Sequence, residues 1–101
     1  MTVVIAGHIS IDPAKREQAI AAVRPLMEAT HKETGCVAYI FSEDLLEPGT
    51  FRIFEQWESQ ANIDAHIKTP HMATFQKVVP TLGVRGMKLL KYEVSKVGPV
   101  R

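Results

Sequence analysis

The chain has 101 residues, close to the commonest size of a single domain, so we expect one domain with one core. Hydrophobic residues make up 46% of the chain and charged residues 23%, a balance that excludes disordered and fibrous proteins. The formal net charge is +1 and the two signs are interspersed, so the sequence carries no basic patch of the kind that binds nucleic acid.

The sequence also bears on where the protein works. No apolar run approaches the ~20 residues that a membrane-spanning helix needs, and the first residues do not resemble a signal peptide. The single cysteine, Cys36, cannot form an internal disulfide. We therefore expect a cytoplasmic protein that neither inserts into a membrane nor binds nucleic acid.

The first strand and the first helix are predicted from periodicity. Residues 2–11 are rich in β-branched side chains and place Val3, Ile5 and Ile9 on one face. Asp12 and Pro13 are typical of a helix start, and apolar residues at three- and four-residue spacing then predict a helix over residues 13–34. Gly35 is expected to end that helix in a left-handed conformation.

Two strands and a turn follow. Residues 36–43 and 51–57 are apolar and aromatic runs, and the segment between them ends in Glu47-Pro48-Gly49-Thr50, which predicts a hairpin. The first of these strands is apolar on both faces, which indicates that both of its faces are covered.

The remaining elements are two helical segments and a last strand. Ser59 is expected to cap a short helix that ends near Lys68, and Thr69-Pro70 is expected to open a second segment that ends near Leu82. Residues 87–95 predict the last strand, and residues 97–101 are expected to form a tail outside a single domain of residues 1–96.

The predicted order is β-α-β-β-α-β. This is the ferredoxin-like, split βαβ arrangement of the α+β class, in which a four-stranded antiparallel sheet carries its helices on one face. Because the second and last strands are apolar on both faces, we expect a second copy of the chain to cover the other face, giving a homodimer. If Tyr39 and Leu90 face that partner, glutamate at either position should weaken association, whereas a charge change at Lys15 should not.

Three segments carry a family resemblance. They are Glu33-Thr34-Gly35-Cys36-Val37-Ala38-Tyr39, Phe51-Arg52-Ile53-Phe54-Glu55-Gln56-Trp57, and Ala65-His66-Ile67-Lys68-Thr69-Pro70-His71 with Phe75 after it. Together they resemble the antibiotic biosynthesis monooxygenase domain family, the dimeric α+β barrel proteins that include quinol monooxygenases. The resemblance implies a homodimer whose two sheets close into a barrel, with a pocket between sheet and helices in each subunit.

The resemblance leaves the reaction open, because the family includes cofactor-free oxygenases, haem-degrading enzymes and isomerases. The haem-degrading branch is a poor match, since its helical tryptophan falls near His66 and its haem-ligating histidine falls near Gln76. Glycine-rich phosphate loops and nucleotide-binding fingerprints are also absent from the sequence. We expect no protein-bound cofactor, with molecular oxygen as a co-substrate.

Glu55 is the candidate acid or base on a strand. By the strand period of two it shares a face with Phe51, Ile53 and Trp57, an otherwise apolar row. Burial there would raise the pKa of its carboxyl group and prepare it for proton transfer near neutral pH. The alternative is a structural carboxylate held by a backbone amide or by Arg85. Trp57 is expected in the core, with its indole as a candidate wall of the ligand site.

His66 and His71 are the other candidates for proton transfer. Five residues apart on one helix they would face different ways, but the break at Thr69-Pro70 can turn His71 toward His66. Their spacing is not a zinc motif and no cysteine or carboxylate cluster completes one, so no metal is expected. For His66, the alternative to an acid or base is a histidine that caps the break between the helices.

The resulting hypothesis assigns catalysis to His66 and Glu55, in a pocket that Tyr39, Trp57, His71, Met72 and Phe75 line for substrate. We expect a cofactor-independent monooxygenase acting with O2 on a small quinol, or on a polyphenolic or anthrone-like aromatic. Two alternatives stay open: an isomerase or tautomerase of a small oxygenated metabolite, and a dimer that binds a small molecule without turnover.

Overall fold

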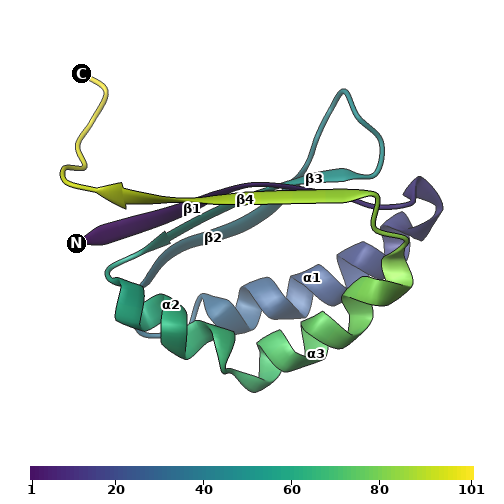
Figure 1. Ribbon diagram of the computed structural model, residues 1–101, viewed down its shortest axis with the longest axis horizontal. Helices are drawn as coiled ribbons and strands as arrows, with labels where there is room; N and C mark the ends of the chain where they lie inside the picture. Colours follow the sequence, from purple (N-terminus) through teal and green to yellow (C-terminus); the bar gives the residue numbers. More distant parts are fainter.

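The computed structural model describes residues 1–101 and has the predicted α+β fold. One antiparallel sheet has the strand order β2-β3-β1-β4, and every helix lies on the same side of it (Figure 1). The strands are β1 (Thr2–Ser10), β2 (Cys36–Glu43), β3 (Thr50–Trp57) and β4 (Gly86–Val94). The helices are η1 (Pro13–Lys15), α1 (Arg16–Thr30), α2 (Gln60–Ile67), α3 (Pro70–Val78) and η2 (Val79–Leu82).

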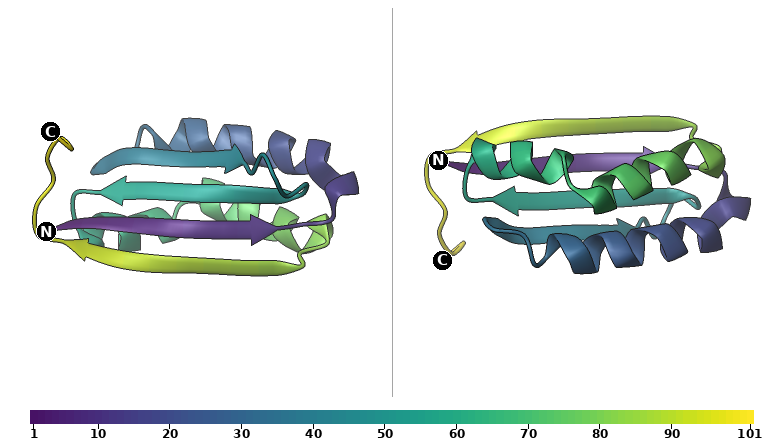
Figure 2. Two further views of the ribbon diagram at one scale, coloured as in Figure 1. Left: turned by 90° about the horizontal axis from the view of Figure 1, so that it is seen from above. Right: turned by 90° about the horizontal axis from the view of Figure 1, so that it is seen from below.

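The helices cover the sheet unevenly. Seen from the helix side, α1 runs along β2, while α2 and α3 form a bent pair over the middle of the sheet (Figure 2). The edge strand β4 extends beyond this cover, and both chain termini lie at one end of the sheet (Figure 2). None of the helices is both long and apolar enough to cross a membrane.

The first helix ends earlier than its sequence predicts. The Asp12 side chain accepts from the Ala14 amide at 3.0 Å, which confirms the predicted start, but α1 stops at Thr30. The chain then turns through a bond from the Glu33 amide to the Thr30 carbonyl (3.0 Å). Residues 31–34 are all polar, so a further helical turn would bury no apolar surface.

Strand register decides which side chains meet the helices. Tyr39 is paired with Glu55, and Glu55 with Ile5, so these three side chains form one row across the helix-facing side. The residues adjacent to these three in sequence form a row on the opposite side of the sheet, which we call the outer face. This row consists of Ile40, Phe54 and Ala6, and Leu90 of β4 continues it.

Tyr39 therefore does not meet the condition set for it as an interface residue, because its side chain faces the helices. The side chain is 3% exposed and packs in the helix-facing core with Trp57. The reason is an irregularity between Cys36 and Ala38, where Val37 is an extra residue in the strand. Such a bulge reverses the alternation of side chains that follows it.

The outer face carries large apolar side chains that this chain leaves uncovered. The exposed fractions of these residues are 47% for Ile40, 40% for Phe54, 46% for Leu90 and 49% for Tyr92. The core, in contrast, lies entirely between the sheet and the helices, in one cluster around Phe51 and Ile53 and another around Trp57.

Candidate functional site

A pocket of about 400 Å³ lies between the sheet and the helices α2 and α3. This volume is within the range of about 300–1,000 Å³ typical of small-molecule sites. Its walls are mostly apolar, and Glu55, His66 and Tyr39 are the ionisable side chains that line it. The apolar walls include Ile5, Ile9, Phe41, Ile53, Ile63, Met72, Phe75, Met87 and Leu89.

The turn after α1 brings a fourth ionisable group to this region. Gly35 has φ +81°, and a Cβ atom there would lie 2.2 Å from the Asn62 side chain, so only glycine fits. Asn62 belongs to the first turn of α2, where its amide donates to the capping Ser59 hydroxyl (3.4 Å). Gly35 thus packs against the start of α2, and Glu33, two residues before it, reaches His66 in the last turn of the same helix.

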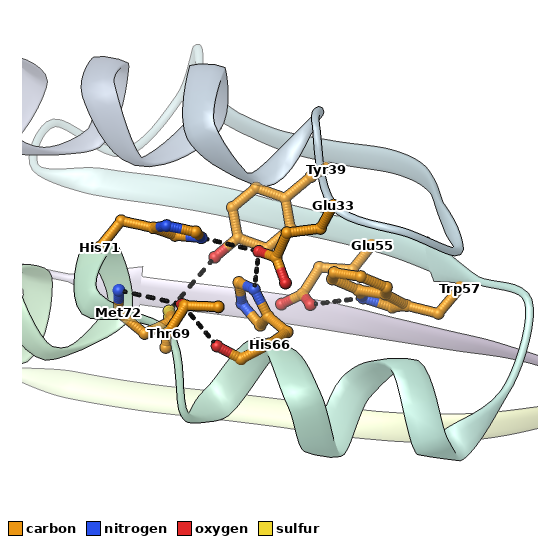
Figure 3. Close-up of polar contacts among 8 residues, drawn as sticks. All are labelled: Glu33, Tyr39, Glu55, Trp57, His66, Thr69, His71 and Met72. Atoms are coloured by element: carbon orange, nitrogen blue, oxygen red, sulfur yellow. Dashed lines mark hydrogen bonds and ion pairs between the residues drawn. The ribbon is translucent and has the colours of Figure 1, made fainter.

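Glu33 joins the two histidines. Its Oε2 lies 2.6 Å from His66 Nδ1 and 2.7 Å from His71 Nε2, and Figure 3 shows the carboxylate between the two imidazoles. Both rings can satisfy these contacts in the neutral form, each by donating an N–H to the same oxygen. His66 then carries its proton on Nδ1 and has a lone pair on Nε2. The sequence offered no carboxylate cluster to accompany these histidines, whereas the structure places the carboxylate of Glu33 beside both of them.

His66 is held rigidly. It is 3% exposed, and its ring centroid lies 4.9 Å from that of Trp57 and 5.2 Å from that of Tyr39. The Thr69 hydroxyl donates to the His66 carbonyl (2.7 Å) while also capping α3, so the break between the helices fixes the backbone as well. The imidazole hydrogen-bonds through Nδ1 to Glu33, Nε2 has no hydrogen-bond partner in the protein, and the residue lines the pocket.

Glu55 is a buried carboxyl group with one protein partner. Its Oε1 accepts from the Trp57 indole N–H at 3.0 Å, and the side chain is 7% exposed. Burial raises the pKa of Glu55, while the indole hydrogen bond and the nearby His66 act in the opposite direction. Arg85, the alternative partner considered from sequence, instead approaches Asp12 at 3.7 Å.

Tyr39 adds a hydroxyl group to the same pocket. Its oxygen lies 4.0 Å from the Met72 sulfur, which is a weak contact. Burial raises the pKa of Tyr39, and the charges of Glu55 and Glu33 raise it further. The hydroxyl therefore stays protonated and can donate a hydrogen bond to a ligand oxygen.

We predict that Glu55→Gln stabilises the protein and does so more at pH 8 than at pH 4. An unfolded glutamate loses its proton near pH 4.3, whereas the folded Glu55 retains it to higher pH. The wild type therefore loses stability as pH rises between the two pKa values, and glutamine lacks this loss. Urea unfolding of both proteins at each pH measures the difference; equal gains at both pH values would contradict the prediction.

The structure brings most of the predicted site residues into one place. Glu55, His66, Tyr39, Met72 and Phe75 all line the pocket. Trp57 and His71 do not: the Trp57 indole is fully buried behind Glu55, and His71 reaches the site through Glu33. These two residues support the pocket groups from outside.

Glu33 is the site residue that sequence reasoning missed. A signal for it exists in the predicted hairpin, because Cys36 at the start of β2 pairs with Trp57 at the end of β3. The segments just before β2 and just after β3 must therefore lie at the same end of the sheet. Those segments contain Glu33 and the start of α2.

A second, wider depression lies near the chain termini and has different chemistry. It measures about 570 Å³ and is lined by Met1, Thr2, Glu58 and residues 94–97. Its charged side chains, Glu58 and Lys96, are exposed to solvent. Buried ionisable groups gather only at the smaller pocket, which is therefore the candidate active site.

Comparison with known proteins identifies relatives across the chain. The uncharacterized protein sll1783 of Synechocystis is 33% identical over 93% of this chain, which spans 64% of that protein. The Escherichia coli protein named "Probable quinol monooxygenase YgiN" is 36% identical over 48% of this chain and 54% of its own length. A conserved protein of unknown function from Bacteroides thetaiotaomicron has a crystal structure with TM-score 0.83 and 31% identity, covering 92% of this chain and 97% of that one.

A match to a protein-family model establishes the family. The family model for antibiotic biosynthesis monooxygenases matches residues 2–78 of this chain, from β1 to the end of α3. The matched stretch includes every ionisable residue of the pocket. The chain belongs to the antibiotic biosynthesis monooxygenase family.

Proposed function

We propose that the protein is a cofactor-independent monooxygenase that oxidises a small quinol, or a polyphenolic or anthrone-like aromatic, with molecular oxygen. The observation that carries this proposal is His66, whose Nδ1 lies 2.6 Å from Glu33 while the same ring lines an apolar pocket. A carboxylate at Nδ1 holds an imidazole in the tautomer whose Nε2 accepts a proton, as in other acid–base sites.

The proposed reaction begins with proton removal. His66 Nε2 takes a phenolic proton from the bound quinol, because the anion gives electrons to O2 far more readily than the neutral molecule does. The quinol supplies four electrons, one oxygen atom of O2 enters the ring, and the other leaves as water. A hydroxyquinone and water account for every atom and electron, so this reaction consumes no external reductant.

The other pocket groups suit the remaining steps. Because burial raises the pKa of Glu55, its carboxyl group holds a proton to higher pH than usual and can deliver it to the departing oxygen. The Tyr39 hydroxyl can donate to the second quinol oxygen. Phe75 and the aliphatic walls favour a flat apolar ring and exclude water from the reactive anion.

We propose further that the working form is a homodimer joined through the outer faces of two sheets. The support is the apolar surface of Ile40, Phe54, Leu90 and Tyr92, each at least 40% exposed in the single chain. Obligate interfaces typically bury about 2,000 Å² or more in total, and such an interface would cover these side chains. The helices and the pocket stay on the far side of each sheet.

Oxygen uptake tests the proposed activity. Purified protein treated with a chelator is supplied with a panel of quinols, anthrone-like phenols and non-phenolic aromatics in an oxygen electrode. We expect uptake with one or more ionisable phenols and none with the non-phenolic compounds of the same size. Substrate conversion at an undiminished rate under nitrogen would contradict oxygenation and favour the isomerase.

A further inference from the structure

The geometry points to a divalent transition-metal site formed by Glu33, His66 and His71, and to metal occupancy as an inhibited state of the enzyme. One ligand atom from each residue lies within 4.8 Å of the other two. The ligands come from the turn after α1, from α2 and from α3, which the fold brings together (Figure 3). Two imidazoles and one carboxylate are a ligand set that Zn²⁺, Co²⁺ and Fe²⁺ accept in proteins.

Small movements convert the hydrogen-bonded cluster into a metal site. The Glu33 oxygen now lies 2.6 and 2.7 Å from the two ring nitrogens. An ion bound about 2.0–2.2 Å from each donor atom separates neighbouring donors by roughly 3.3 Å in tetrahedral geometry. The two contacts must therefore open by roughly 0.6–0.7 Å, and the ion takes the place of the two hydrogen-bonding protons.

The surroundings allow this opening and leave room for further ligands. The side chains of His71 and Glu33 are 23% and 14% exposed, whereas that of His66 is 4% exposed. An ion can therefore arrive from the side of His71, with water in its remaining positions. The buried His66 supplies the fixed ligand, because aromatic contacts and the break between α2 and α3 hold its ring.

Metal binding has a direct consequence for His66. A neutral imidazole carries one proton, so an ion on the Nδ1 lone pair leaves that proton on Nε2. Nε2 of His66, a residue that lines the pocket, then carries a proton and can no longer accept one from a substrate. This consequence rests on the proposed function, whereas the metal site itself does not.

Cobalt titration tests the site without any substrate. Chelator-treated, metal-free protein is titrated with Co²⁺ and followed by visible absorption, and then with Zn²⁺ as competitor. We expect one ion per chain, displaced by Zn²⁺, and binding at least about 100-fold weaker in both His71→Ala and Glu33→Gln, because each variant loses a ligand. His8→Gln is the matched control and should bind Co²⁺ like the wild type.

Each outcome decides the proposal. Loss of binding in both ligand variants with unchanged melting curves supports the site, and Zn²⁺ should then suppress turnover of the wild type. Binding that persists in either variant, or that His8→Gln abolishes, overturns the site. A metal site without oxygenase activity would refute the proposed function alone, and oxygenase activity without metal binding would refute this inference alone.

Discussion

Replacing His66 with alanine is expected to lower kcat/KM by roughly 10²–10⁴, the usual contribution of a general base. This corresponds to about 3 to 5 kcal/mol of transition-state stabilisation. The effect should be this large because His66 is the pocket residue whose second ring nitrogen is anchored by a carboxylate at 2.6 Å. Initial rates of oxygen uptake in chelator-treated samples measure it.

Two further variants separate loss of the base from loss of structure. His66→Asn retains an N–H group close to Nδ1 that can still donate to Glu33, but it lacks Nε2; it should be as inactive as the alanine variant while melting near the wild type. Added imidazole should partly restore His66→Ala by occupying the vacated space. Full activity in His66→Asn would contradict the assignment of His66 as the general base.

Leu90→Glu is expected to weaken dimer formation by at least 100-fold. Leu90 lies on the outer face and is 46% exposed in the single chain, so a folded monomer tolerates the substitution. In a symmetric dimer each subunit would bury the unpaired carboxylate of the introduced glutamate in the interface. Burying these two charges should cost about 3 kcal/mol or more of association free energy. Light scattering over a range of concentrations measures the molar mass.

Lys15→Glu provides the control for charge. Lys15 lies in η1, at the helical layer and away from the outer face, so this variant should have the same molar mass as the wild type. A wild type that scatters as a single chain at micromolar concentration would contradict the dimer, as would a Leu90→Glu variant that associates normally. Neither result would bear on the His66 assignment.

The fold followed from sequence because its local signals agree with one another. Strand alternation, the Asp12 and Ser59 caps and the proline at the start of α3 each predicted an element that the structure contains. The end of α1 was misplaced because Gly35 was taken as the residue that stops the helix, whereas α1 ends at Thr30. What ends the helix is tertiary: the polar residues 31–34 have no apolar surface to cover.

The site was harder to predict because it depends on register and on distant segments. One extra residue at Val37 decides that Tyr39 faces the pocket, and an apolar strand gives no polar alternation from which to detect the bulge. Glu33 is 33 residues from His66, so only the pairing of the two hairpin strands indicates that their segments meet. The prediction of the hairpin was not carried on to the side chains at its open end.

The most direct test of the proposed function is the fate of the two oxygen atoms. Metal-free protein and its best quinol substrate are reacted under ¹⁸O₂ in ordinary water, and the product is analysed by mass spectrometry before ring oxygens exchange. We expect one ¹⁸O atom in each product molecule, one ¹⁸O atom in released water, and near-complete loss of labelled product with His66→Asn. Product formed without label, or hydrogen peroxide released in place of oxygen incorporation, would contradict it.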